Sequence, residues 1–145
     1  MKSPLSYVRK NILALQPYST ARDEFKGGEI SVWIDANESP YPNGVNRYPD
    51  PHQRKLKHRI SKLMDIPTES IFVGGAGSDE AIDLAFRIFC EPRKDNVVAI
   101  SPSYGVYKVA AAVNDIEIRE VLLNDDFSLP VQRILAAADD FTKII

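Results

Sequence analysis

A glycine-rich turn between an apolar run and an amphipathic stretch is the part of this sequence best suited to bind a ligand. The apolar run is Ile71–Val73, the turn is Gly74–Gly77, and apolar residues recur at helical spacing after Ser78. Glycines tolerate positive φ and keep Cβ atoms away from a ligand. A helix that begins after such a turn offers free backbone N–H groups to an anion. The pattern predicts a phosphate site around Gly75–Asp79.

Other interpretations of the same turn have to be weighed. It lacks the Gly-Lys-Ser/Thr of a P-loop, and Glu80 stands where a dinucleotide-binding fingerprint has its third glycine. The next strand ends in Ser101-Pro102-Ser103, without the acidic residue of such folds, so a generic nucleotide binder is disfavoured. A plain strand-to-helix turn, capped by Ser78 or Asp79 and binding nothing, stays open.

Two tyrosines follow the next strong apolar run. The run Asn96–Ser101 is nearly continuous, which is typical of a strand covered on both faces, and Tyr104 and Tyr107 come directly after it. Ligands of open parallel sheets collect at the carboxyl ends of the strands. An anion site beside an aromatic face would suit a phosphorylated flat ring. Packing of both tyrosines at the start of a helix is the open alternative.

The elements that position these groups alternate along the chain. Their order predicts an α/β fold with a largely parallel sheet and flanking helices. The apolar patterns predict helices over 6–15, from Pro51 (capped by Asp50) to Met64, over 78–89, around 109–113 and from Pro130 to Leu135, and strands over 32–34, 71–73, 96–101, 116–122 and 142–145.

Composition narrows the class of protein. The chain has 145 residues, enough for one domain with a core, and a net charge of −2, which gives no footprint for nucleic acid or an anionic membrane. No apolar run approaches a membrane span, and the N-terminus lacks a signal-peptide core. The single cysteine, Cys90, excludes an internal disulfide, predicts a cytoplasmic protein and is interpreted as a core residue. His52 and His58 lack partners at metal-ligand spacing, so no metal is expected.

Five stretches, in order and at matching spacing, resemble the N-terminal part of the histidinol-phosphate aminotransferase family. They are Pro17–Arg22, Asp35–Pro40, Asn46–Pro51, Gly77–Glu80 and Pro102–Tyr107. The family belongs to the fold type I aminotransferases, which use pyridoxal 5'-phosphate (PLP). The resemblance implies an N-terminal arm with a short helix over 1–30, followed over 31–145 by an incomplete PLP-binding α/β large domain that stops within a strand.

The resemblance also implies roles in cofactor binding. Gly77, Ser78 and Asp79 would hold the cofactor phosphate through backbone N–H groups, which agrees with the physical interpretation of the turn. Tyr104 would stack on the pyridine ring, and Tyr48 would reach the phosphate bound by the other subunit of a homodimer.

Substrate roles follow in the same way. Tyr18 would approach the substrate from the arm, Asn37 would lie near its amino-acid end, and Glu38 nearer its imidazole. The implied reaction interconverts L-histidinol phosphate and 2-oxoglutarate with imidazole-acetol phosphate and L-glutamate, in L-histidine biosynthesis.

One essential group of the family has no match in this sequence. The Schiff-base lysine lies in a Ser-x-x-Lys-type segment downstream in the family, and the expectation is that it lies beyond Ile145. The chain alone is therefore expected to be an inactive fragment. Two alternatives remain: a non-catalytic fragment that binds a phosphate, a cofactor or a partner, and an aminotransferase of the same fold that acts on aromatic or other amino acids.

Overall fold

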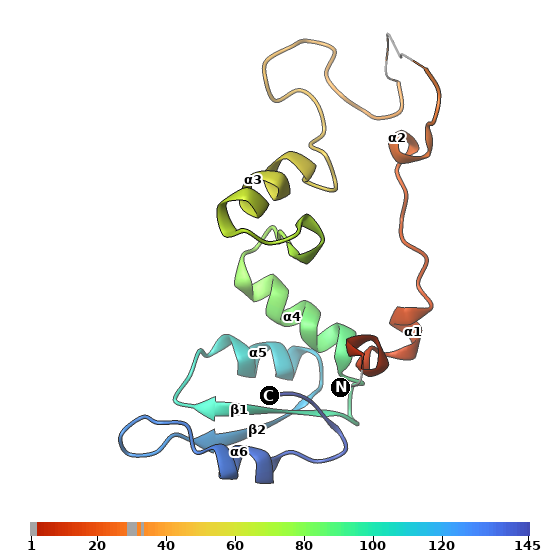
Figure 1. Cartoon of the computed structure of the whole chain (residues 1–145). Helices are drawn as coiled ribbons and strands as arrows, with labels where there is room; N and C mark the ends of the chain where they lie inside the picture. Colours follow the sequence, from red (N-terminus) through yellow and green to blue (C-terminus); the bar gives the residue numbers. More distant parts are fainter. Residues whose placement is uncertain (1–2, 29–31, 33) are drawn as a thin grey trace. The chain divides into compact units, whose positions relative to one another are not determined.

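The computed structural model describes residues 3–28, 32 and 34–145 (Figure 1). The chain divides into two compact units. The sheet unit comprises Gly74–Ile145 and the described residues up to Leu15, and the loop unit comprises Gln16–Val73. The boundary predicted near residue 30 between an arm and an incomplete large domain stays a prediction.

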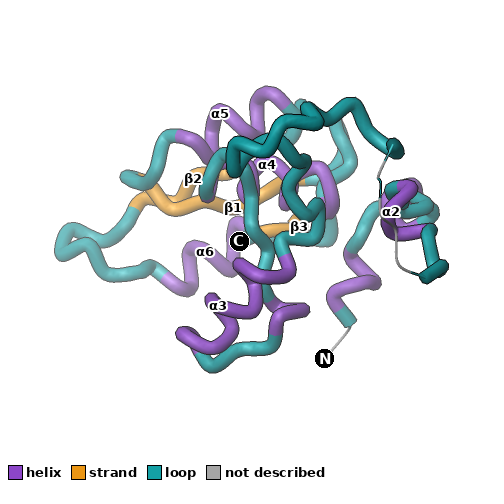
Figure 2. Tube along the Cα trace, turned by 90° about the horizontal axis from the view of Figure 1, so that it is seen from above, coloured by secondary structure: helices purple, strands orange, loops and turns teal. Residues whose placement is uncertain are grey.

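The sheet unit contains three parallel strands. These are β1 (Asn96–Ser101), β2 (Glu117–Leu122) and β3 (Thr142–Ile144), in the order β2-β1-β3. Asn96 lies opposite Glu117 on one side and opposite Thr142 on the other. The parallel α/β architecture expected from the alternating pattern is confirmed, with β1 as the central strand in Figure 2.

Helices cover both faces of this sheet (Figure 1). The long helix α4 (Ser78–Phe89) and α5 (Val106–Val113) lie on one face, and α6 (Val131–Ala137) lies on the other. A short 3₁₀-helix, Pro4–Tyr7, and the single turn α1 (Lys10–Leu13) belong to the same unit. A helix between each pair of parallel strands is what their connection requires, since a parallel pair needs a long crossover.

The core of the sheet unit forms where α4 and α5 meet the strands. Its buried members come from both helices, β1 and the segments beside them: Phe86, Cys90, Val97, Ala110, Ala111 and Ile116. Cys90 is 1% exposed, and burial raises the pKa of its thiol to about 11. A buried, protonated thiol is a poor nucleophile, so the interpretation of Cys90 as a core residue is confirmed.

A buried polar residue ties β3 to β1. The Asn96 side chain donates to Asp139 Oδ1 at 2.9 Å and accepts from the Thr142 hydroxyl at 2.6 Å. Both halves of the buried amide are therefore paired, as burial of a polar group demands.

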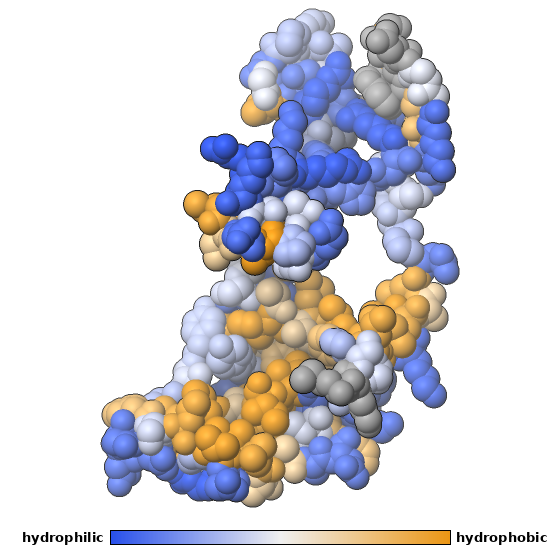
Figure 3. Space-filling view, in the orientation of Figure 1, coloured by the Kyte–Doolittle hydropathy of each residue, from blue (hydrophilic) through white to orange (hydrophobic). Residues whose placement is uncertain are grey.

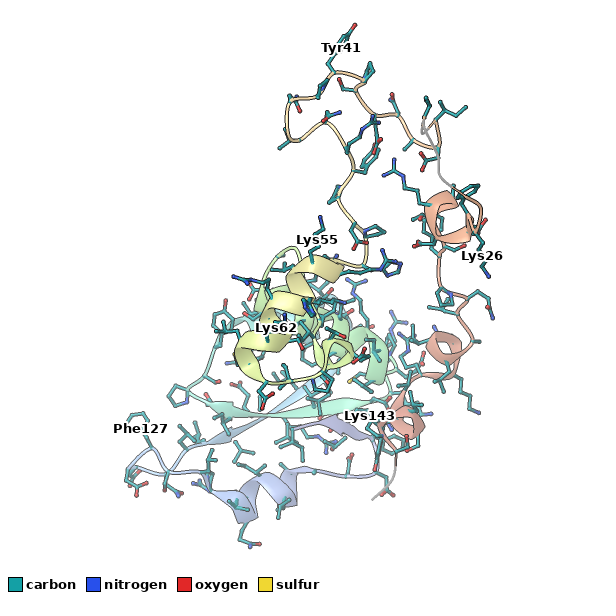
Figure 4. The ribbon with its side chains drawn as sticks, turned by 45° about the horizontal axis from the view of Figure 1, so that its top comes forward. Lys26, Tyr41, Lys55, Lys62, Phe127 and Lys143 are labelled. Carbon is teal, nitrogen blue, oxygen red and sulfur yellow. The ribbon has the colours of Figure 1, made fainter. Side chains whose placement is uncertain are left out.

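The loop unit is mostly irregular. It contains α2 (Ala21–Glu24), α3 (Arg54–Met64) and a 3₁₀ turn, Thr68–Ser70. Thr20 and Asp23 form a reciprocal capping box that starts α2, a helix that the sequence patterns did not predict. Lys55 and Lys62 are exposed on α3 (Figure 4).

Three predicted elements differ from the observed ones. The helix expected over 6–15 is replaced by the two short helices before Leu15. The helix expected from Pro51 begins only at Arg54, because Asp50 accepts hydrogen bonds from the backbone of both His52 and Arg54 and closes a turn first.

The strand predicted at Ile71–Val73 is also wrong. Ile71 has extended backbone (φ −107°, ψ 116°), but the segment pairs with no strand in the described part of the chain. Extended backbone becomes a β-strand only when a neighbour accepts its hydrogen bonds. For the strand predicted over 32–34, Trp33 lies outside the described residues, and Val32 and Ile34 have no regular structure.

Apolar side chains remain exposed on the sheet unit, as Figure 3 shows. Examples are Leu129, Leu135 and Ile145, each more than half exposed. Among the helices that the structure describes, none has the length and apolar character needed to cross a membrane.

Candidate functional site

The glycine turn ends in a helix whose N-cap residue is a glycine and therefore has no side chain that could cap it. Gly77 is the N-cap of α4, with φ 69° and ψ −147°, a conformation that is essentially restricted to glycine. A Cβ built at Gly77 would meet no atom within 4 Å. The alternative in which Ser78 or Asp79 caps the helix is wrong, because both residues lie inside its first turn. The first N–H groups of α4 are therefore available to an anion, and the residues present fit a phosphate group.

Tyr104 is held beside this helix start by Asp79. The Tyr104 hydroxyl donates to Asp79 Oδ1 at 3.1 Å, across 25 residues of sequence. This bond to a carboxylate is the main cause that raises the pKa of the Tyr104 hydroxyl. The two residues predicted to serve one cofactor are thus in contact, with Tyr104 still 52% exposed.

The neighbouring tyrosine has a different environment. Tyr107 lies edge-on to Tyr104, with ring centroids 5.9 Å apart and an interplanar angle of 90°. It is half-buried and lines a pocket of about 240 Å³ at the carboxyl end of β1, together with Ser101 and Lys108. The Lys108 ammonium is paired with Glu120 at 2.8 Å. Tyr107 therefore serves packing at least in part, whereas Tyr104 presents its ring to solvent.

In the loop unit, Glu38 is the centre of an ion-pair cluster. Its carboxylate accepts from Arg22 Nη2 at 2.9 Å and from Arg47 Nη1 at 2.8 Å. It also accepts from the backbone N–H of Tyr48 at 2.8 Å. Arg22 in turn binds Asp35 at 2.8 Å. The cluster joins three of the stretches that carried the family resemblance.

Glu38 is held as a charged group. Its side chain is only 4% exposed, and the Arg47 bond, followed by the Tyr48 N–H, lowers the pKa of its carboxyl from 4.5 to about 2. Sequence reasoning selected Glu38 but not its partners. Arg22 and Arg47 stood in the quoted stretches, and their charge, opposite to that of Glu38, was the available signal.

The other predicted site residues of this unit are exposed. Tyr18 is 89% and Tyr48 61% exposed, and Asn37 is exposed as well. Within the unit the structure connects Glu38 to the backbone of Tyr48, while the ligand roles of all four residues stay predictions. In residues 3–28, 32 and 34–145, no group of three His, Cys, Asp or Glu residues is placed to hold a metal ion.

The Glu38 cluster makes a pH-dependent contribution that can be measured. Because the pKa of Glu38 is depressed in the folded chain, its stabilisation is complete above pH 4.5 and is lost as the pH falls through about 2. Carboxyl-carbon NMR of the labelled chain should show a low titration midpoint for Glu38, and Arg47→Ala should raise this midpoint. Arg59 is exposed on α3, so Arg59→Ala should leave the Glu38 midpoint unchanged. An equal midpoint in the wild-type protein and both variants would contradict the ion pair between Glu38 and Arg47.

Comparison with known proteins places these features in a family context. The model of the family described as aminotransferase class I and II matches residues 21–145. Histidinol-phosphate aminotransferases from Bacteroides fragilis and Bacteroides thetaiotaomicron are 56% and 54% identical over all 145 residues, and the chain covers 42% of each. The Flavobacterium johnsoniae enzyme of that name is 49% identical over 139 residues, 94% of this chain and 40% of the relative.

A solved structure shows the same fold. It is a Burkholderia pseudomallei protein assigned as an aminotransferase, with a TM-score of 0.56 and 22% identity. The match covers 69% of this chain and 30% of that protein. The chain thus spans about two fifths of the length of the curated relatives that it matches.

Proposed function

This chain belongs to the class I and II aminotransferase family, and we propose that it supplies the cofactor-phosphate end of a PLP-dependent aminotransferase. The observation that carries the proposal is the contact between Asp79 and Tyr104, which puts an exposed aromatic ring beside an uncapped helix start. A phosphate and a flat ring are the two parts of PLP that such a site could bind.

The predicted cofactor residues of the sheet unit have two separate tasks in this proposal. The backbone N–H groups of Gly77, Ser78 and Asp79 would bind the phosphate, because a helix N-terminus favours an anion. Tyr104 would pack its ring against the pyridine ring of the cofactor. The hydrogen bond between the Tyr104 hydroxyl and Asp79 would fix the orientation of the tyrosine ring. When bound, PLP would supply the electron sink that allows an amino group to move between substrates.

The residues of the loop unit would serve the substrate and the second subunit. We propose a homodimer in which Tyr48 contacts the phosphate bound by the other subunit, and substrate contacts by Tyr18, Asn37 and Glu38. The contacts of Glu38 support a further task, which is to position Tyr48. The ion pair with Arg47 holds the Glu38 carboxylate, and this carboxylate accepts a hydrogen bond from the backbone N–H of Tyr48.

The proposed substrates are histidinol phosphate with 2-oxoglutarate, and imidazole-acetol phosphate with glutamate in reverse. Relatives that bear the name histidinol-phosphate aminotransferase and share more than half of the residues along the whole chain support this choice. The participation in histidine biosynthesis and the cytoplasmic location expected from the sequence remain parts of the proposal.

We further propose that the 145-residue chain does not transaminate by itself. Transamination needs a lysine that bonds to the cofactor and moves a proton. In the described chain, Lys108 is paired with Glu120 and Lys143 lies 3.7 Å from Asp95. These contacts support structural roles for both lysines.

The test is a binding and activity assay on the complete product of the gene that encodes this chain. After incubation with PLP and reduction with borohydride, intact-mass and peptide analysis should find one pyridoxyl group, on a lysine outside residues 1–145. The purified protein should form glutamate from 2-oxoglutarate faster with histidinol phosphate than with aromatic amino acids, and should have the mass of a dimer in light scattering.

Different failures would remove different parts of the proposal. A protein that binds no PLP would refute the cofactor assignment and favour a non-catalytic fragment. A preference for aromatic amino acids would refute only the substrate. A pyridoxyl group on Lys108 would refute the structural role of that residue.

A further inference from the structure

Glu80 reaches back from the first turn of α4 to the glycine turn that precedes it. Its Oε2 accepts hydrogen bonds from the backbone N–H of Gly75 at 2.5 Å and of Ala76 at 3.1 Å. A Cβ built at Gly75 would lie 3.7 Å from this same oxygen, so the carboxylate lies directly against the turn.

This contact divides the donors of the turn into two sets. The N–H groups of Gly75 and Ala76 are used by Glu80, whereas no side chain in the described part of the chain caps those at the start of α4. An anion would therefore find its donors at Gly77–Asp79. A carboxylate that bonds to two consecutive N–H groups also restricts the backbone between them, since charge-assisted hydrogen bonds are the strong ones.

We propose that Glu80 is a positioning residue for the phosphate-binding turn, and this inference rests on the proposed function. Glu80 occupies the first two donors and holds the backbone that leads into Gly77, so that the next three N–H groups converge on one phosphate. It acts through the backbone and does not touch the ligand.

The charge of Glu80 opposes this role and provides a way to test it. A carboxylate beside a phosphate site repels the phosphate, so the benefit of Glu80 must come from its hydrogen bonds. One oxygen makes both bonds, and the amide oxygen of a glutamine can take the same place. Glu80→Gln should therefore keep the turn in position and remove the charge repulsion, whereas Glu80→Ala should remove the hydrogen bonds and leave the turn unrestrained.

The experiment measures the affinity of the complete gene product for PLP and for pyridoxal, which lacks the phosphate. Glu80→Ala should raise the Kd for PLP at least about tenfold, because two backbone donors lose a charged acceptor, and should leave the Kd for pyridoxal unchanged. Glu80→Gln should bind PLP as tightly as the wild-type protein or more tightly. Asp83→Asn is the matched charge control, since Asp83 lies one turn further along α4 and bonds to Arg87 and Asn114.

A second measurement does not depend on the cofactor. Hydrogen exchange of the cofactor-free protein should be faster at the amides of Gly75 and Ala76 in Glu80→Ala and near the wild-type rate in Glu80→Gln. A variant that has merely lost folding stability would exchange faster throughout α4 and would bind pyridoxal less well.

Three results would overturn the inference. Tighter PLP binding by both variants would show that the carboxylate competes with the phosphate, and wild-type affinity in Glu80→Ala would show that it has no effect on the turn. An equal loss of PLP and pyridoxal affinity in Glu80→Ala would show a general structural role. If the wild-type protein itself binds no PLP, the proposed function fails instead.

Discussion

Gly77→Ala is expected to weaken PLP binding by the complete gene product at least about tenfold. Gly77 has φ 69° and ψ −147°, where a side chain adds strain of about 1–3 kcal/mol. A built Cβ meets no neighbour within 4 Å, so the expected effect comes from the backbone and not from a clash. The variant would relieve the strain by rotating the turn, and the N–H groups of Ser78 and Asp79 would then no longer converge on the phosphate.

A second helix start in the same unit provides the control. Gly105 is the N-cap of α5, has ordinary helical backbone (φ −62°, ψ −22°) and also has open space around its Cβ position. Gly105→Ala should therefore fold and bind PLP like the wild-type protein. Fluorescence titration with PLP gives both affinities, and equal values for the two variants would contradict a phosphate site that depends on the conformation of Gly77.

Phe86→Ala is expected to have the largest effect on folding. Phe86 is 4% exposed and lies in the cluster that joins α4 to α5 and the sheet. Removal of a buried aromatic ring leaves a cavity and costs about 3–5 kcal/mol. Because single domains are stable by only about 5–15 kcal/mol, this loss can unfold the sheet unit.

Urea unfolding of the chain, followed by circular dichroism, measures this loss. Phe86→Leu, which retains most of the apolar volume, keeps the comparison possible if the alanine variant does not fold, and should cost about 1 kcal/mol. Phe127→Ala is the control, since Phe127 is 71% exposed in the loop before α6 (Figure 4) and should change stability by less than about 0.5 kcal/mol. A loss below about 1 kcal/mol in Phe86→Ala would contradict the assignment of Phe86 to the core.

Local patterns in the sequence were sufficient for the strands and for the helices α4 to α6 of the sheet unit, although not for its first residues, where two short helices replace the one expected. The apolar run at Asn96–Ser101 became β1, and the amphipathic stretch after Gly77 became α4. The glycines before α4 also marked the turn correctly, because the positive φ of Gly77 is a requirement of the local backbone. These features depend on residues that are close in sequence, which is why the amino-acid pattern predicts them.

Contacts between distant residues were decided by the tertiary structure alone. Asp79 and Tyr104 meet across 25 residues, and Glu38 meets Arg22 of α2 and Arg47 of a later loop. The segment Ile71–Val73 has the composition of a strand but finds no neighbour to pair with in the described chain.

The sequence by itself thus determined the α/β alternation, the position of the glycine turn before α4 and the family resemblance. Only the tertiary structure decided which donors of the turn are occupied by Glu80, which carboxylate orients Tyr104, and which predicted strand is paired. The physical reason is that helix periodicity and glycine conformation act over a few residues, whereas a hydrogen bond or a strand pairing depends on where the folded chain brings its partner.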